Sequence, residues 1–333
     1  MSYLLTPLST GALGLSNRLV MPPMATAKAE ADGKVSAAIL DYYREKSAGG
    51  YFSLVIVEHS YIQQAGKASA NQLSAADDSV VDGLRALAGV IKSSGAKAVV
   101  QLNHAGSSAS EEITGIKPVG PSAVVNPRQG GIPQALTGAE IKTVVEAFAL
   151  AAGRVKAAGF DGVEIHSAHG YLLNQFFSPL TNQRTDEYGG SVFNRIKIHL
   201  EVIAAVRAAV GKHYPVLLRL GAGDFTEGGT TVVDSILAAQ AFVEAGVDVI
   251  DISGGFSGYV NPESTAQGYF SELSAPVKQA VTVPVILTGG ITEAEAAEEL
   301  LAAGKADLIG VGRAVLQDSG WAKRAVEQLY SKQ

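Results

Sequence analysis

Short apolar segments alternate with segments of helical periodicity along most of the chain, and this alternation limits its fold more than any other feature. Near-continuous apolar runs of this kind are typical of strands buried on both faces of a parallel sheet. Helices are expected at 140–157, with Gly159 as its stop, and at 192–210, 232–245 and 293–303. The expected strands are 18–21, 53–58, 98–102, 162–166, 216–220, 249–253, 285–288 and 307–311.

Eight strand–helix units predict an α/β fold, the (β/α)8 TIM barrel, which takes about 250 residues before insertions. A doubly wound open sheet gives a similar alternation, but eight evenly distributed units favour closure. Residues 4–15 are expected to form an N-terminal hairpin that caps the bottom of the barrel. The segment 107–133, rich in Gly, Pro and Ser, is expected to pass over the active face and, with 254–270, to supply most of the pocket walls. We therefore expect a single domain over residues 1–333.

Charge and cysteine content exclude several classes of function. The net charge is −6 and the pI is about 5.6, and Lys and Arg are scattered singly, which argues against a nucleic-acid or anionic-membrane surface. The absence of cysteine excludes disulfides, thiolate zinc sites and cysteine-ligated iron–sulfur clusters. The start has no basic segment followed by an apolar run, and no apolar stretch reaches about 18 residues, so a cytoplasmic protein is expected.

Two glycine-rich segments follow the last two strands. In a TIM barrel the carboxyl ends of all strands face one pocket. Thr288 is followed by Gly289 and Gly290, and the eighth strand ends in Gly312 and Arg313. Glycine lets backbone N–H groups approach a phosphate closely, and an arginine can pair with the dianion, so these segments predict a phosphate site. The alternative is that the glycines only allow tight turns between strand and helix.

Two polar residues end otherwise apolar strands. A guanidinium such as Arg219 is costly there unless an anion or a conjugated acceptor offsets its burial. It fits a reduced flavin, which carries negative charge at its pyrimidine end, but a buried salt bridge with Asp251 or Glu164 explains it equally well. Gln101 offers donors and an acceptor that match the same flavin edge, although polar strand ends are common.

The segment 164–172 carries two imidazoles and a phenol directly after the fourth strand. As neutral donors, His166 and His169 can hold a carbonyl or nitro oxygen of a conjugated alkene, and Tyr171 can donate a proton to its α-carbon. A metal site with Glu164 is a weaker reading, since no third ligand from a separate element is evident, and we expect no metal. The histidines could also be satisfied core residues.

The segment 221–226 contains two glycines but lacks the third glycine of a dinucleotide fingerprint, and no Rossmann unit surrounds it. A nicotinamide would therefore enter as a transient substrate.

An ordered series of motifs resembles the Old Yellow Enzyme family along nearly the whole chain. Arg219 and the glycines of the last two strands add to it. The other matching segments are NRLVMPPM at 17–24, VE at 57–58, QLNHAG at 101–106, AGFDGVEIH at 158–166, AHGYL at 168–172, FSPL at 177–180 and NQRTDEYGG at 182–190. Each motif is weak by itself, but so many in order are highly specific.

The resemblance implies a barrel that binds FMN non-covalently and works by a ping-pong reaction. NADPH or NADH would reduce FMN, whose N5 would pass a hydride to the β-carbon of an activated alkene. His166 and His169 would bind the substrate oxygen, and Tyr171 would donate the proton. The implied FMN contacts are Pro23, Met24 and Ala25 along the ring system, Gln101 and Arg219 at the pyrimidine end, and Gly289, Gly290, Gly312 and Arg313 at the phosphate.

The sequence departs from the family pattern in three ways. Relatives often have Thr or Cys where this chain has Ala25, so the flavin potential is expected to be shifted. Relatives of the short bacterial type often have a tyrosine at the position of Ala27. Multidomain relatives carry an iron–sulfur cluster, which a chain without cysteine that ends at Gln333 is not expected to have.

Two alternatives to an alkene reductase stay open at this point. One is a flavin-binding sensor or partner protein with little turnover, and the other is a non-flavin lyase or isomerase acting on a phosphorylated metabolite. A small-molecule partner is expected, and the sequence leaves homo-oligomer formation open.

Overall fold

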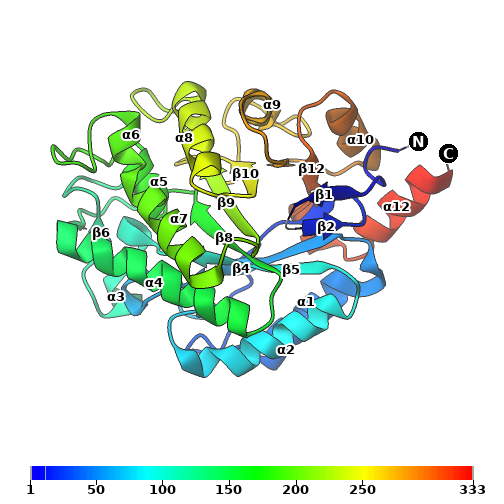
Figure 1. Cartoon of the computed structure of the whole chain (residues 1–333), viewed down its shortest axis with the longest axis horizontal. Helices are drawn as coiled ribbons and strands as arrows, with labels where there is room; N and C mark the ends of the chain where they lie inside the picture. Colours follow the sequence, from blue (N-terminus) through cyan, green and yellow to red (C-terminus); the bar gives the residue numbers. More distant parts are fainter. Residues whose placement is uncertain (1, 12, 332–333) are drawn as a thin grey trace.

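The structure is a computed structural model that describes residues 2–11 and 13–331. Within these residues eight parallel strands close into a barrel in the order β10-β11-β12-β3-β4-β5-β8-β9, which confirms the predicted TIM barrel (Figure 1). Each predicted strand overlaps an observed one. The barrel strands are β3 (Leu19–Met21), β4 (Leu54–Tyr61), β5 (Lys97–Asn103), β8 (Gly162–Ser167), β9 (Val216–Gly221), β10 (Val249–Ser253), β11 (Val285–Thr288) and β12 (Leu308–Gly310).

Helices cover the outside of this barrel (Figure 1). The longer ones are α1 (Ala37–Ser47), α2 (Val81–Lys92), α4 (Gly138–Ala157), α7 (Lys197–Val210), α8 (Val232–Glu244), α9 (Ser271–Ala280), α10 (Ala294–Ala302) and α12 (Trp321–Ser331). The short ones are α3 (Glu111–Thr114), α5 (Leu172–Phe177), α6 (Val192–Arg195) and α11 (Arg313–Gln317), with 3₁₀ turns at Ala48–Gly50, Gln64–Gly66, Asp78–Val80 and Gly106–Ser108. None of the helices in the described ranges is long and apolar enough to cross a membrane.

Capping side chains set the limits of the helices. The hydroxyl of Thr137 accepts a hydrogen bond from the Glu140 N–H, and the Glu140 carboxylate accepts one in return, so α4 begins with a capping box. Gly159 follows this helix with a φ of 88°, as a stop residue should. The predicted helix 192–210 is present as two consecutive helices, α6 and α7, which meet at Ile196 (φ −89°, ψ 0°).

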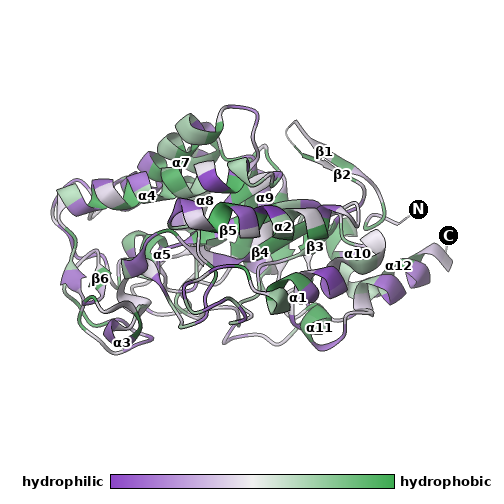
Figure 2. Ribbon diagram, turned by 90° about the horizontal axis from the view of Figure 1, so that it is seen from below, coloured by the Kyte–Doolittle hydropathy of each residue, from purple (hydrophilic) through white to green (hydrophobic). Residues whose placement is uncertain are grey.

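The N-terminal hairpin closes one end of the barrel. Strands β1 (Leu8–Thr10) and β2 (Leu13–Leu15) pair antiparallel, and the turn residue 12 of the predicted hairpin lies outside the described residues. Leu13 and Leu15 join a buried cluster with apolar residues of the barrel strands, which confirms the capping role; its other members are Val20, Leu54, Ile56, Val99, Leu217, Val249, Ile286 and Leu308. Figure 2 shows the hairpin and the region of α3 and β6 (Val119–Gly120) on opposite sides of the barrel.

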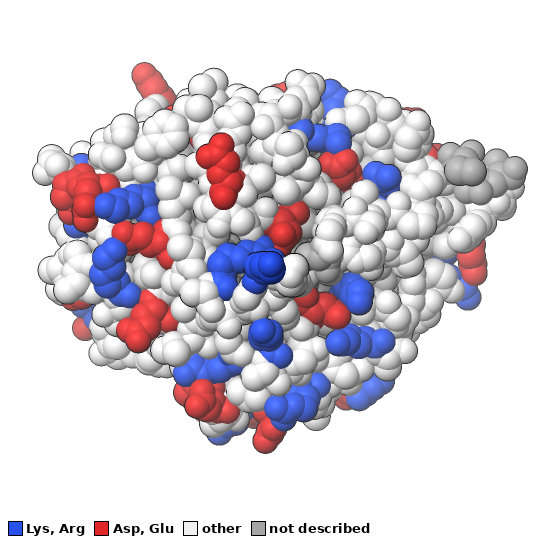
Figure 3. All heavy atoms as spheres, viewed as in Figure 1, with Lys and Arg blue, Asp and Glu red and all other residues white. Residues whose placement is uncertain are grey.

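Charged side chains of both signs are interspersed on the face of the molecule shown in Figure 3. Many are paired at the surface, as Lys142 is with Glu201 at 2.6 Å and Lys197 with Glu187 at 2.6 Å. No extended basic stripe is visible on this face.

His199 is a buried histidine behind β8. Its Nε2 lies 2.8 Å from the Ser167 hydroxyl, and its ring stacks on Phe242 at 5.2 Å. Burial lowers the pKa of the imidazole to about 3. An unfolded histidine has a pKa of about 6.5. Below pH 6.5 the unfolded chain therefore binds a proton at His199 that the folded chain does not bind. The stability contribution of neutral His199 is therefore present above pH 6.5 and is lost as the pH falls.

Replacing His199 with Gln should reduce the pH dependence of stability. The free energy of unfolding should depend on pH less steeply by about 1.4 kcal/mol per pH unit between about pH 4 and 6, because one fewer proton is taken up on unfolding. Urea denaturation at several pH values measures this slope. His213→Gln, at an exposed histidine, is the matched control and should leave the slope unchanged. Equal slopes for His199→Gln and the unchanged chain would contradict the prediction.

Candidate active site

A cavity of about 840 Å³ opens at the carboxyl ends of the barrel strands. Strand ends from around the barrel contribute to it because barrel closure points them at one space. Every residue predicted from the sequence lines this cavity: Pro23, Met24, Ala25, Gln101, His166, His169, Tyr171, Arg219, Gly289, Gly290, Gly312 and Arg313.

The prediction for the cavity walls is only half right. The segment 254–270 lines the cavity through Tyr259, Val260, Asn261, Ser264, Thr265, Tyr269 and Phe270. Among the described lining residues none comes from 107–133. That segment instead packs behind the loop that carries the histidines, where Ser108 donates a hydrogen bond to the Gly170 carbonyl (2.8 Å) and Arg128 donates one to the His169 carbonyl (2.7 Å).

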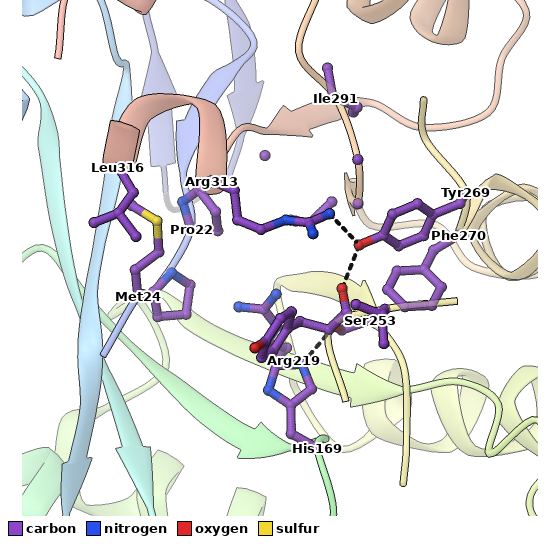
Figure 4. Close-up of a pocket in the computed structure, with 18 of the residues that line it drawn as sticks. Pro22, Met24, His169, Arg219, Ser253, Tyr269, Phe270, Ile291, Arg313 and Leu316 are labelled. Atoms are coloured by element: carbon purple, nitrogen blue, oxygen red, sulfur yellow. Dashed lines mark hydrogen bonds between the residues drawn. The ribbon is translucent and has the colours of Figure 1, made fainter. Parts of the chain in front are cut away.

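One end of the cavity is built from glycines around Tyr269. Gly289 and Gly290 have φ values of 136° and 68°, and a Cβ on either would lie within 2.7 Å of the Tyr269 ring. Only glycine fits these two positions. Arg313 points at the same ring, and its Nη2 donates a hydrogen bond to the Tyr269 hydroxyl at 3.0 Å (Figure 4). No carboxylate of the described residues pairs with Arg313, so its positive charge is available to an anion.

Tyr269 was not identified from the sequence. It precedes α9 in a segment without a motif, and only its packing against the two glycines shows what it does. Pro22 and Met24 lie across the cavity from Tyr269 and Phe270, as Figure 4 shows. The cavity therefore has an apolar wall facing an aromatic one, with a cation at one end.

A buried cluster of charged and polar residues lies deeper, on neighbouring strands. Arg219 of β9 is 3% exposed, and its Nε lies 3.3 Å from Oδ2 of Asp251, its register partner on β10. The salt bridge considered from the sequence is therefore present, although Arg219 also faces the cavity. Gln101 of β5 donates a hydrogen bond to the Glu164 carboxylate on β8 at 2.8 Å. One buried guanidinium thus accompanies two buried carboxyl groups.

Both carboxyl groups have a raised pKa. Burial raises the pKa of Asp251 to about 6, and the neighbouring guanidinium of Arg219 opposes that rise. Burial and the charge of Asp251 together raise the pKa of Glu164 well above its usual range. Burial therefore disfavours the ionised form of both carboxyl groups, and the charge of Arg219 partly offsets this effect.

The two predicted histidines meet at the other side of the cavity. The rings of His166 and His169 lie edge to face with centroids 5.1 Å apart, and His166 lies 5.2 Å from the ring of Tyr171. His169 has a φ of 61° and places its Nε2 2.7 Å from the Ser253 hydroxyl. Nδ1 of His166 has no partner among the described residues.

All three of these groups are neutral near pH 7. Burial lowers the pKa of His166 and His169 well below the usual value, and the charge of Arg219 adds to this effect. Burial raises the pKa of Tyr171, with a smaller opposing effect from Arg128. Neutral imidazoles can donate hydrogen bonds without competing for the proton of the phenol, which stays on its oxygen.

The interpretation of residues 164–172 as part of a metal site is not supported. In the described ranges no group of three or more His, Asp or Glu side chains is arranged to hold a metal ion. The core reading is also wrong for His166 and His169, since both line the cavity. A third histidine, His59, also lines the cavity.

The sequence matches the family described as NADH:flavin oxidoreductase / NADH oxidase over residues 3–332. The chain belongs to this family.

Curated relatives in this family include short and long proteins. The chain is 40% identical over 332 residues to an NADPH dehydrogenase of Bacillus licheniformis, an alignment that covers 99% of the chain and 95% of that protein. It is 42% identical over 323 residues to an NADH oxidase of Thermoanaerobacter brockii, covering 95% of the chain. It spans 50% of the length of that NADH oxidase.

The fold is also that of the family's solved structures. An Old Yellow Enzyme homologue from Zymomonas mobilis superimposes with a TM-score of 0.86 and 26% identity, over 98% of this chain and 92% of that one. The resemblance to the Old Yellow Enzyme family is therefore confirmed, and family membership favours a flavin protein over a non-flavin lyase or isomerase.

Proposed function

We propose that this family member is an FMN-dependent NAD(P)H oxidoreductase that reduces C=C bonds activated by a carbonyl or nitro group. The observation that carries the proposal is the arrangement of two neutral histidines beside a protonated tyrosine in the cavity. The relatives named NADPH dehydrogenase and NADH oxidase support the choice of hydride donor.

The cavity residues fit FMN in both shape and charge. The unpaired Arg313 and the turns at Gly290 and Gly312 would hold the phosphate, where a Cβ at 290 would strike Tyr269. The wall formed by Pro23, Met24 and Ala25 would lie along the ring system, with Gln101 and Arg219 at its pyrimidine edge. When bound, FMN supplies a hydride that originates from NADH or NADPH.

The histidine pair would bind and polarise the substrate. Both imidazoles donate hydrogen bonds in their neutral form, so they can hold one carbonyl or nitro oxygen and withdraw electron density from the conjugated alkene. Tyr171, 5.2 Å from His166, would then give its phenolic proton to the α-carbon. Its raised pKa keeps this proton in place until the alkene carbon becomes basic.

The direct test begins with the purified protein. It should be yellow or take up FMN, and anaerobic stopped-flow mixing with NADPH and with NADH should bleach the flavin. Adding 2-cyclohexenone or a nitroalkene should restore the colour as the alkene is reduced. A protein that takes up no FMN defeats the proposal, and one that binds FMN without alkene turnover is the sensor or partner protein considered above.

Ala25 gives a test of the flavin environment. Ala25→Thr should make the midpoint potential of bound FMN more positive, because a hydroxyl donor stabilises the added negative charge of the reduced ring. Ala25→Val has the same shape without the hydroxyl and is the matched control. Spectroelectrochemical titration measures both potentials. Equal potentials in the Thr and Val variants would contradict this role for the position.

A further inference from the structure

His59 is the one histidine of the cavity to which the proposed function gives no role. It lies near the carboxyl end of β4, two residues before the strand ends, and lines the cavity. Its ring stacks on that of Tyr171 at a centroid distance of 5.4 Å and an angle of 29°, and it lies 6.3 Å from the ring of His166. A histidine in contact with both the proton donor and a substrate-binding ring is placed to touch the substrate.

The hydrogen bonds around His59 fix which nitrogen carries the proton. The amide oxygen of Gln72 accepts the Ala68 N–H at 2.6 Å, which sets the orientation of that amide. The Gln72 NH₂ group therefore donates, to Nδ1 of His59 at 2.8 Å and to its carbonyl at 3.0 Å. Nδ1 must accept, so the proton of the neutral ring is on Nε2.

The Nε2–H of His59 has no partner among the described residues, although its ring lines the cavity. Burial lowers the pKa of His59 to about 4, so the ring is neutral at pH 7 and offers one donor. The hydrogen bonds from Gln72 thus orient the ring of His59, and its single N–H donates to none of the described residues. A ligand or water in the cavity can therefore accept a hydrogen bond from this N–H.

The aromatic contacts separate His59 from the histidine that completes the substrate-binding pair. His169 contacts His166 and Tyr259, whereas His59 contacts His166 and Tyr171. Both rings therefore lie near His166, His59 next to Tyr171 and His169 next to Tyr259. Because His59 lines the same cavity 6.3 Å from the ring of His166, its donor can reach a second acceptor on the same small molecule.

We propose that His59 is a specificity-determining residue that donates a hydrogen bond from Nε2 to a second acceptor oxygen of the substrate. The preferred substrates are then alkenes that carry a carbonyl group at both ends of the double bond, such as cyclic imides and enediones. This inference rests on the proposed function, in which His166 and His169 hold the first oxygen.

Two saturated ligands that differ by one oxygen test it without turnover. N-methylsuccinimide has two carbonyl groups, and N-methylpyrrolidinone has the same ring with one. Calorimetry on the oxidised holoprotein gives both dissociation constants. In His59→Phe, which keeps the stacked ring but loses the donor, the constant for the succinimide should rise about tenfold, the worth of one hydrogen bond. The constant for the pyrrolidinone should change less than about twofold.

His59→Gln, which has an amide N–H donor at this position, should recover part of the preference for N-methylsuccinimide over N-methylpyrrolidinone. Loss of affinity for both ligands alike, or for neither, would overturn the inference and leave His59 as packing for Tyr171. Turnover gives a second readout: KM for N-methylmaleimide should rise in His59→Phe while KM for 2-cyclohexenone stays the same. The chain has no cysteine, so the maleimide has no thiol to alkylate.

The two hypotheses fail in different ways. Turnover of 2-cyclohexenone together with an unchanged ratio of the two dissociation constants in His59→Phe would reject the role of His59 and keep the proposed function. Absence of turnover would reject the proposed function. The ligand ratio would still decide whether His59 binds a second oxygen.

Discussion

Tyr171→Phe is expected to lower kcat for alkene reduction by about 10²- to 10⁴-fold, the usual contribution of a positioned proton donor. Phenylalanine keeps the ring that stacks on His59 and contacts His166, so the substrate-binding geometry should persist. The dissociation constant of an alkene should therefore change little. The loss comes from the missing phenolic proton, since neutral histidines with strongly lowered pKa values are poor substitutes for it.

The half-reaction with the nicotinamide is the internal control for this variant. NADPH bleaching should proceed at the rate of the unchanged protein, because no proton is given to an alkene in that step. The rate of nitroalkene reduction should fall less than the rate of enone reduction. A nitronate is a stable anion that can leave the site and take its proton from water. If Tyr171→Phe lowered the rates of flavin reduction and of alkene reduction by the same factor, the assignment of Tyr171 as proton donor would be contradicted.

Arg219→Met is expected to destabilise the protein by about 3–5 kcal/mol, the usual cost of leaving one member of a buried ion pair alone. Asp251, which is fully buried, would lose the guanidinium 3.3 Å away that opposes the rise of its pKa. Its pKa would then rise further. A carboxyl group whose pKa is higher in the folded than in the unfolded chain, where it is about 3.9, lowers the stability at pH values above 3.9. The decrease in the free energy of unfolding should therefore be larger at pH 8 than at pH 5.

Urea denaturation at the two pH values measures this effect. The matched control is the double variant Arg219→Met with Asp251→Asn, which removes the buried charge as well and should recover much of the stability. Asp251→Asn alone should also destabilise, because Arg219 is then the unpaired ion. A double variant no more stable than Arg219→Met alone would show that the pair does not couple as the geometry indicates.

The barrel could be predicted because its strands are apolar on both faces and evenly spaced. Once a sheet of eight strands closes, residues 94 to 212 positions apart, such as Gln101, Arg219 and Arg313, must meet at one end of it. The candidate site therefore followed from the order of the strand ends. That order does not depend on any side-chain conformation.

Other features depend on packing that the sequence does not display. Tyr269 takes its place from contacts with two glycines in another strand end, and Gln72 orients His59 from 13 positions away through a bond that no periodic pattern encodes. The segment 107–133 has the composition of a loop over a pocket, but the bond from Arg128 to the His169 carbonyl holds it behind the wall.

The contact between β3 and β12 has a consequence for how the protein is made. Strand β12 (Leu308–Gly310) pairs with β3 (Leu19–Met21), and Gly312 approaches the Met24 sulfur, so the two ends of the chain build one side of the cavity. The barrel therefore cannot close until residues 308–310 have been synthesised. The cavity cannot hold a cofactor until then, so nascent chains and chains truncated before β12 should not bind FMN.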